Sequence, residues 1–174
     1  ARDPDGARAA ERGARVAGAR RERERAVREV AAGSGAGVGA GSVVWLAAML
    51  RRRGGGGCLL PLRLAAASLL GDAALDSGSV VGPVALGMVL AALASVLFGL
   101  VYVSVLPQGA RTPAAVLVGL VFTAAVWAVA WMGLARVLAP VLHAAAEPMT
   151  ALGLHAAYGV LLGLLVPFLR RILP

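Results

Sequence analysis

The ionisable side chains inside apolar stretches are the first candidates for chemistry. His155 stands within an apolar run near the C-terminus, and Tyr158 follows one turn later on the same face if the run is helical. A histidine placed in this way can relay a proton, bind haem or a metal, or donate a hydrogen bond to a substrate. The alternative is a neutral imidazole that bonds a carbonyl of a neighbouring helix.

Two further polar pairs have helical spacing but lie outside the longest apolar runs. His143 and Glu147 are four residues apart, and so are Asp72 and Asp76. Two residues are too few to define a metal site, and acidic residues in loops are usually solvated. We therefore expect no metal and no cofactor, and we keep His143 and Glu147 only as candidate companions of His155.

No catalytic motif is present. The sequence has no P-loop, no dinucleotide fingerprint after a strand, no nucleophile elbow and no HExxH. The glycine-rich run GSGAGVGAG leads into an apolar stretch, so phosphate binding is not expected there. The single cysteine, Cys58, excludes an intramolecular disulfide and is expected to pack as a small apolar side chain. We expect a protein that is not an enzyme.

The elements that position these residues are apolar runs long enough to cross a bilayer. The chain of 174 residues is 59% hydrophobic, and its mean hydropathy is +0.80, which is typical of a membrane protein. A membrane-spanning helix needs about 20 apolar residues. Three runs meet this length clearly, and a fourth is weaker because its first half is rich in glycine. The sequence therefore predicts an all-α bundle of about four transmembrane helices, at residues 31–50, 80–106, 114–138 and 151–169.

A shorter apolar segment at residues 61–70 contains Arg63 and predicts a helix lying in the membrane interface. If residues 31–50 cross the membrane, the arginine triplet at 51–53 lies on the same side as this interfacial helix and opposite the N-terminal tail. If they do not, a three-span arrangement places the triplet on the same side as the tail. In the four-span arrangement twelve arginines face five across the membrane, which favours a cytoplasmic tail.

Residues 1–30 form a charged tail that differs from the transmembrane domain at residues 31–174. The net charge is +8, and nine of the arginines precede residue 29. Acidic residues at i,i+4 spacing predict a helix over residues 14–30. The tail lacks aromatic residues for base stacking, so nucleic acid is not an expected partner. The positive charge suits the cytoplasmic side of the membrane, and it offers anionic lipid or an acidic partner a docking surface made of Arg20, Arg21, Arg25 and Arg28.

A repeated pattern links the two halves of the transmembrane domain. SVLFGLVYVSVLP at residues 95–107 and HAAYGVLLGLLVP at residues 155–167 each place a proline eight residues after an aromatic–glycine pair, where it is expected to end the span. SVVWLAA at residues 42–48 similarly matches AAVWAVA at residues 124–130. We interpret the pattern as two helical hairpins related by a parallel duplication, with chance similarity as the alternative. Close helix crossings are expected at Gly33, Gly37, Gly41, Gly99, Gly159 and Gly163.

The segment HAAYGVLLG at residues 155–163 resembles the last helix of small uncharacterised four-helix membrane proteins of GC-rich bacteria, which often carry His-x-x-Tyr-Gly there. The resemblance covers about the final 140 residues and excludes the arginine-rich tail. It implies four spans and a location in the bacterial inner membrane, and it implies no activity.

Together these features favour a non-catalytic membrane protein that serves as an accessory or structural subunit of a larger complex. Its expected partners are membrane lipids and either other subunits or further copies of itself. Polar groups are scarce in the predicted spans, whereas a solute path normally needs several. The alternatives are a small oligomeric transporter or channel, with His155, Tyr158 and Glu147 along its path, and a cofactor-binding protein with His155 as ligand.

Overall fold

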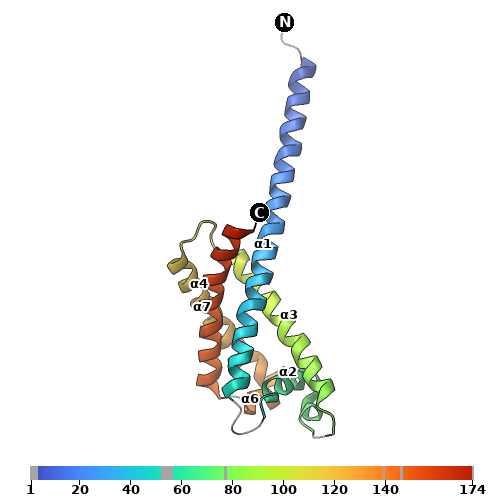
Figure 1. The fold of residues 1–174 in the computed structure, drawn as a ribbon, viewed down its shortest axis with the longest axis vertical. Helices are drawn as coiled ribbons and strands as arrows, with labels where there is room; N and C mark the ends of the chain where they lie inside the picture. The colour runs from blue at the N-terminus through green and yellow to red at the C-terminus, as the bar shows by residue number, and fades with distance from the viewer. Residues whose placement is uncertain (1–3, 52–56, 77, 139, 146, 174) are drawn as a thin grey trace.

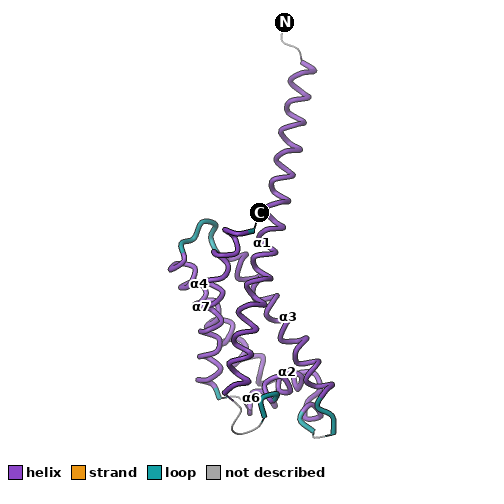
Figure 2. The backbone as a smooth tube through the Cα atoms, in the orientation of Figure 1, coloured by secondary structure: helices purple, strands orange, loops and turns teal. Residues whose placement is uncertain are grey.

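The computed structural model describes residues 4–51, 57–76, 78–138, 140–145 and 147–173, and within these ranges every regular element is helical. Four long helices alternate in direction (Figure 1), and shorter helical elements lie between the first and second and between the third and fourth (Figure 2). They are α1 (Pro4–Arg51), α3 (Val81–Val105), α4 (Thr112–Val129) and α7 (Pro148–Ile172). The shorter elements are α2 (Leu60–Leu70), the 3₁₀ turn η2 (Gly71–Ala74), the π-helical turn η3 (Ala130–Leu134), α5 (Ala135–Leu138) and α6 (Pro140–Ala145).

Four helices are long and apolar enough to cross a membrane, which confirms the expected all-α class for the described residues. They cover Arg15–Arg51, Val81–Val105, Thr112–Val137 and Pro148–Ile172. The third continues from α4 through the π-helical turn into α5. The fourth differs from expectation at Pro167, which lies inside α7 instead of ending it. Contacts made by the turn that follows Pro167, described below, explain why the helix continues there.

The helix α1 is continuous, whereas the sequence predicts a charged helix followed by a separate span. At about 1.5 Å per residue, its 48 residues extend about 72 Å. Its glycine-rich stretch remains helical because it packs against α3 and α7. The N-terminal half stands clear of the bundle as a single helix (Figure 1).

In the bundle, α1 packs between α3 and α7, and α4 packs on α7. The consecutive helices α3 and α4 meet through Tyr102, whose hydroxyl donates to Ala115 O at 2.6 Å and whose ring centroid lies 5.8 Å from that of Phe122. All four long helices contribute to the core, which is made of Ala36, Ala40, Tyr102, Val103, Leu106, Ala115, Tyr158, Leu162 and Val166.

The two ends of the bundle carry different elements. The projecting part of α1, the loop between α3 and α4 and the C-terminus lie at one end, whereas α2 and α6 cover the other (Figure 1). The helix α2 packs on α6 and lies close against α3 at Gly87, where a Cβ would stand 2.7 Å from the Leu62 carbonyl carbon. The predicted interfacial helix at 61–70 thus corresponds to α2.

Arg63 closes the turn that follows α2. Its Nε donates to Ala74 O and its Nη2 to Asp76 O, both at 2.9 Å. The guanidinium therefore bonds backbone carbonyls of the turn that contains Asp72 and Asp76. Cys58, expected to pack as an apolar side chain, is exposed because it precedes α2 in a turn.

Candidate functional site

His155 and Tyr158 share α7 but engage different partners. His155 Nδ1 lies 2.8 Å from Ala151 O, so its partner is a carbonyl of its own helix and not one of a neighbouring helix. Tyr158 is buried, and its hydroxyl donates to Ser95 O of α3 at 2.9 Å. Tyr158 therefore acts as a link between α7 and α3.

His143 and Glu147 belong to separate elements, so they do not form the i,i+4 pair that their spacing suggests. His143 lies in α6, and its ring centroid is 4.7 Å from that of Trp131. Glu147 is the residue before α7, and its Oε2 accepts a hydrogen bond from Thr150 Oγ1 at 2.5 Å. Thr150 Oγ1 in turn accepts from Arg51 Nη2 at 3.1 Å, which joins the end of α1 to the start of α7.

Two polar atoms at this end of α4 are buried without a hydrogen-bond partner among the described residues: Trp127 Nε1 and His143 Nδ1. Trp127 stands one turn before Trp131, and the π-helical turn begins between them at Ala130. An indole N–H can only donate, so Trp127 would suit an acceptor atom. The described residues contain no group of three or more His, Cys, Asp or Glu side chains that could hold a metal ion.

The first close helix crossing joins α1 to α3. A Cβ at Gly37 would lie 3.1 Å from Gly99 Cα, and a Cβ at Gly99 would lie 2.8 Å from Gly37 Cα. On either side of this point, a Cβ at Gly33 would lie 2.8 Å from Val103 Cγ1, and one at Gly41 would lie 2.7 Å from Ser95 Cβ. Glycine lets these two backbones approach closely enough for dispersion contacts along their length.

The second close crossing joins α4 to α7. A Cβ at Gly159 would lie 2.8 Å from the Gly119 carbonyl carbon, and one at Gly163 would lie 2.7 Å from Val116 N. Sequence reasoning missed Gly119. It lies 82 residues after Gly37, the same offset that relates Trp127 to Trp45, so the repeat contained the signal.

The arginines between residues 15 and 27 of the projecting helix are exposed. Arg20 Nε lies 2.8 Å from Glu24 Oε1, and both side chains are well exposed, so this expected pair contributes little to stability. Arg21 and Arg25 are exposed and Arg28 is half-buried. Glu29, which the spacing pairs with Arg25, has a different partner.

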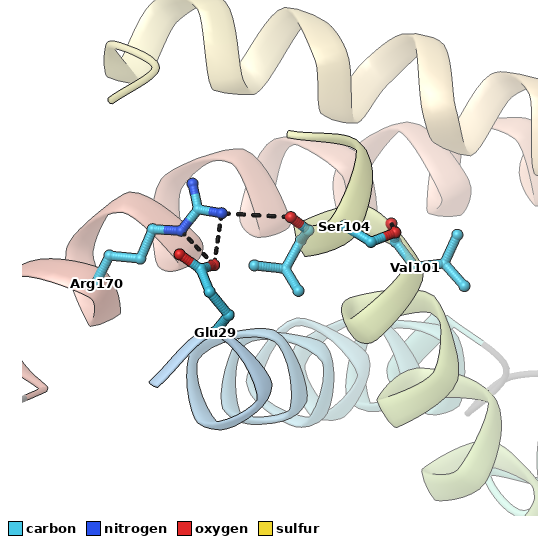
Figure 3. Close-up of polar contacts among 5 residues, drawn as sticks. Glu29, Val101, Ser104 and Arg170 are labelled. Carbon is cyan, nitrogen blue, oxygen red and sulfur yellow. Dashed lines mark hydrogen bonds and ion pairs between the residues drawn. The ribbon is translucent and has the colours of Figure 1, made fainter. Parts of the chain in front are cut away.

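That partner is Arg170, near the end of α7 (Figure 3). Arg170 Nε and Nη2 donate to Glu29 Oε2 at 2.9 and 2.7 Å, and Nη2 also reaches Val103 O at 3.3 Å. The two side chains are 15% and 23% exposed, so the ion pair is mostly shielded from water. The Val103 carbonyl has no helical donor because residue 107, four positions later, is proline. Arg170 therefore joins α7 to α1 and supplies a donor to the end of α3.

A groove of about 670 Å³ opens beside this ion pair, between α1 and the end of α3. Its lining combines apolar side chains with a few polar ones, including Val30, Leu100, Leu106, Gln108, Glu29 and Arg170. In the sequence, Arg170 is only one of the twelve arginines that favour a cytoplasmic tail, and no local pattern connects it to Glu29.

Comparisons with protein families, curated proteins and solved structures find no match for this chain. The fold therefore gives the class of protein: an all-helical chain with four helices long and apolar enough to span a membrane.

Proposed function

We propose that the chain is a non-catalytic integral membrane protein of a bacterial inner membrane, and that it serves as an accessory or structural subunit of a larger membrane complex. The main support is the use made of its polar and small residues. The hydroxyls of Tyr102 and Tyr158 donate to carbonyls of neighbouring helices, and glycines occupy the two close crossings. These groups serve helix association, which in lipid depends on packing and interhelical hydrogen bonds.

The projecting part of α1 is the proposed docking surface for a partner. Residues 15–27 are exposed along their whole length. An exposed single helix that buries little apolar surface is marginally stable in water, and contact with a partner would stabilise it. Its excess of arginine suits an acidic surface.

The cytoplasm is the proposed location of this projecting helix. Its arginines, Arg111, Arg170 and Arg171 belong to segments at the same end of the bundle (Figure 1). An excess of arginine next to the spans favours the cytoplasmic side under the positive-inside rule.

A parallel duplication is the proposed origin of the bundle. The α1–α3 crossing joins Gly37 to Gly99, and the α4–α7 crossing joins Gly119 to Gly159. The offsets between equivalent glycines, 82 and 60 residues, equal those between the matched sequence segments. Agreement of contact points with sequence offsets supports duplication over chance.

Gentle extraction from the native membrane followed by native mass spectrometry tests the proposal. We expect a stoichiometric complex with at least one larger membrane subunit. Replacing Arg20, Arg21, Arg25 and Arg28 together by glutamine should weaken that complex, whereas replacing the same four by lysine should preserve much of it because the charge remains. Recovery of only the single chain or a homo-oligomer would contradict the accessory role.

The transporter alternative makes a distinct prediction. A path through the bundle would use His155, so His155→Ala would abolish flux in reconstituted vesicles while leaving the fold intact. Under the accessory role we expect no protein-dependent flux for the unmodified chain or for His155→Ala. The Tyr158 hydroxyl and His155 Nδ1 already bond backbone carbonyls, so neither is left to line a path.

A further inference from the structure

We propose that the groove beside the Arg170–Glu29 pair binds one anionic phospholipid, with an acyl chain along the apolar wall and the phosphate at Arg170. This inference rests on the proposed membrane location. The arginine-rich tail by itself predicts only a general electrostatic attraction to anionic surfaces. The groove instead offers one defined binding site for a lipid.

The position of the groove suits a lipid. It lies where the apolar helix α3 ends, and its lining runs from Leu100 inside that helix to Pro107 and Gln108 beyond its end. In a bilayer this is the boundary between acyl chains and headgroups. The volume of about 670 Å³ falls within the range of small-molecule sites, about 300–1,000 Å³. An occupant with an apolar tail and a polar head fits this combination.

The charge at this end selects an anionic headgroup. Nε and Nη2 of Arg170 bond Glu29, whereas Nη1 points away from that carboxylate (Figure 3). A guanidinium bonds phosphate strongly and with defined geometry. Residues 15–30 of α1 contain six arginines and three glutamates, and Arg171 adds further positive charge nearby. Each basic residue near the membrane surface strengthens attraction to anionic lipid.

The test uses the full chain in vesicles of equal phosphatidylglycerol and phosphatidylcholine, extracted in mild detergent, with bound lipid counted by native mass spectrometry. We expect about one retained phosphatidylglycerol per chain, in clear excess over phosphatidylcholine. Arg170→Gln should lower the bound fraction about fivefold, the effect of removing one basic contact. Arg171→Gln removes the same charge from the exposed neighbouring residue, which does not line the groove, and should lower retention clearly less than Arg170→Gln does.

Glu29→Gln separates a lipid contact from a purely structural role. Both Arg170→Gln and Glu29→Gln break the ion pair, so a structural role predicts similar losses of lipid. A phosphate contact predicts opposite effects, because Glu29→Gln frees the guanidinium and removes a negative charge. Ala26→Phe provides an independent variant that fills the groove from α1, and Ala17→Phe, two to three turns further out, is its control.

Equal retention of phosphatidylglycerol and phosphatidylcholine would overturn the proposal. So would phosphatidylglycerol retention that neither Arg170→Gln nor Ala26→Phe reduces. A loss of phosphatidylglycerol in Glu29→Gln similar to that in Arg170→Gln would also overturn it. Alkaline extraction of the same vesicles keeps the two proposals apart. A chain released by alkali contradicts the membrane location, whereas a chain that stays embedded without bound phosphatidylglycerol contradicts the lipid site alone.

Discussion

Gly159 and Gly153 provide a matched pair for measuring how much the close crossing of α4 and α7 contributes. Both lie in α7, but their surroundings differ. A Cβ at Gly159 would lie 2.8 Å from the Gly119 carbonyl carbon and would also meet Gly119 O and Thr123 Oγ1. A Cβ at Gly153 would have nothing within 4 Å. Replacing each by alanine therefore makes the same chemical change with and without a steric clash.

The two effects can be estimated separately. Alanine in place of glycine favours a helix by about 0.5–1 kcal/mol, so Gly153→Ala should stabilise the fold by about that amount. At Gly159 the same gain is opposed by overpacking, which typically costs about 1–3 kcal/mol. A backbone neighbour cannot rotate away, so we expect a cost in the upper part of that range. The helix propensity cancels in the comparison, and Gly159→Ala should be less stable than Gly153→Ala by about 2–3 kcal/mol.

Reversible unfolding in mixed detergent micelles, followed by tryptophan fluorescence, measures the difference. The three tryptophans are unchanged in both variants, so the signals are comparable. Gly159→Leu should extend the trend, because a larger side chain forces α4 and α7 further apart. Equal stability of Gly159→Ala and Gly153→Ala would show that the two backbones do not meet at Gly119, and the assigned register of α4 on α7 would be wrong.

Two further predictions concern side-chain hydrogen bonds to backbone carbonyls. Tyr158→Phe and Tyr102→Phe each remove one such bond and should each lower the free energy of unfolding by about 0.5–1.5 kcal/mol. The two losses should add in the double variant because the bonds share no partner, and strong non-additivity would contradict separate links. Arg63→Gln removes the guanidinium that donates to Ala74 O and Asp76 O, so amide hydrogen exchange should become faster around residues 71–76 and stay the same in α4 and α7. Unchanged exchange in residues 71–76 would show that Arg63 does not hold this turn.

The amino-acid sequence determined the helical class and the approximate limits of α3 and α7, although not the start of α1. Long apolar runs leave the backbone little choice in a bilayer except to bond within a helix, and prolines such as Pro113 and Pro148 mark places where a helix can begin. The four-residue spacing of Gly33, Gly37 and Gly41 likewise places them on one helical face, and that face of α1 lies against α3. These features are local, so composition and spacing are enough to predict them.

The tertiary structure decided which of these faces meet and which polar groups become partners. Glu29 has Arg25 at ideal helical spacing, yet it bonds Arg170, 141 residues away, because the last turn of α7 reaches α1 at that level. Arg170 lies just past Pro167, where the sequence predicts the end of the span but α7 continues. Apolar helix faces rich in alanine, leucine and valine look alike to one another in sequence. Only their packing in three dimensions selects the register that joins Gly119 to Gly159 and creates the groove beside Arg170.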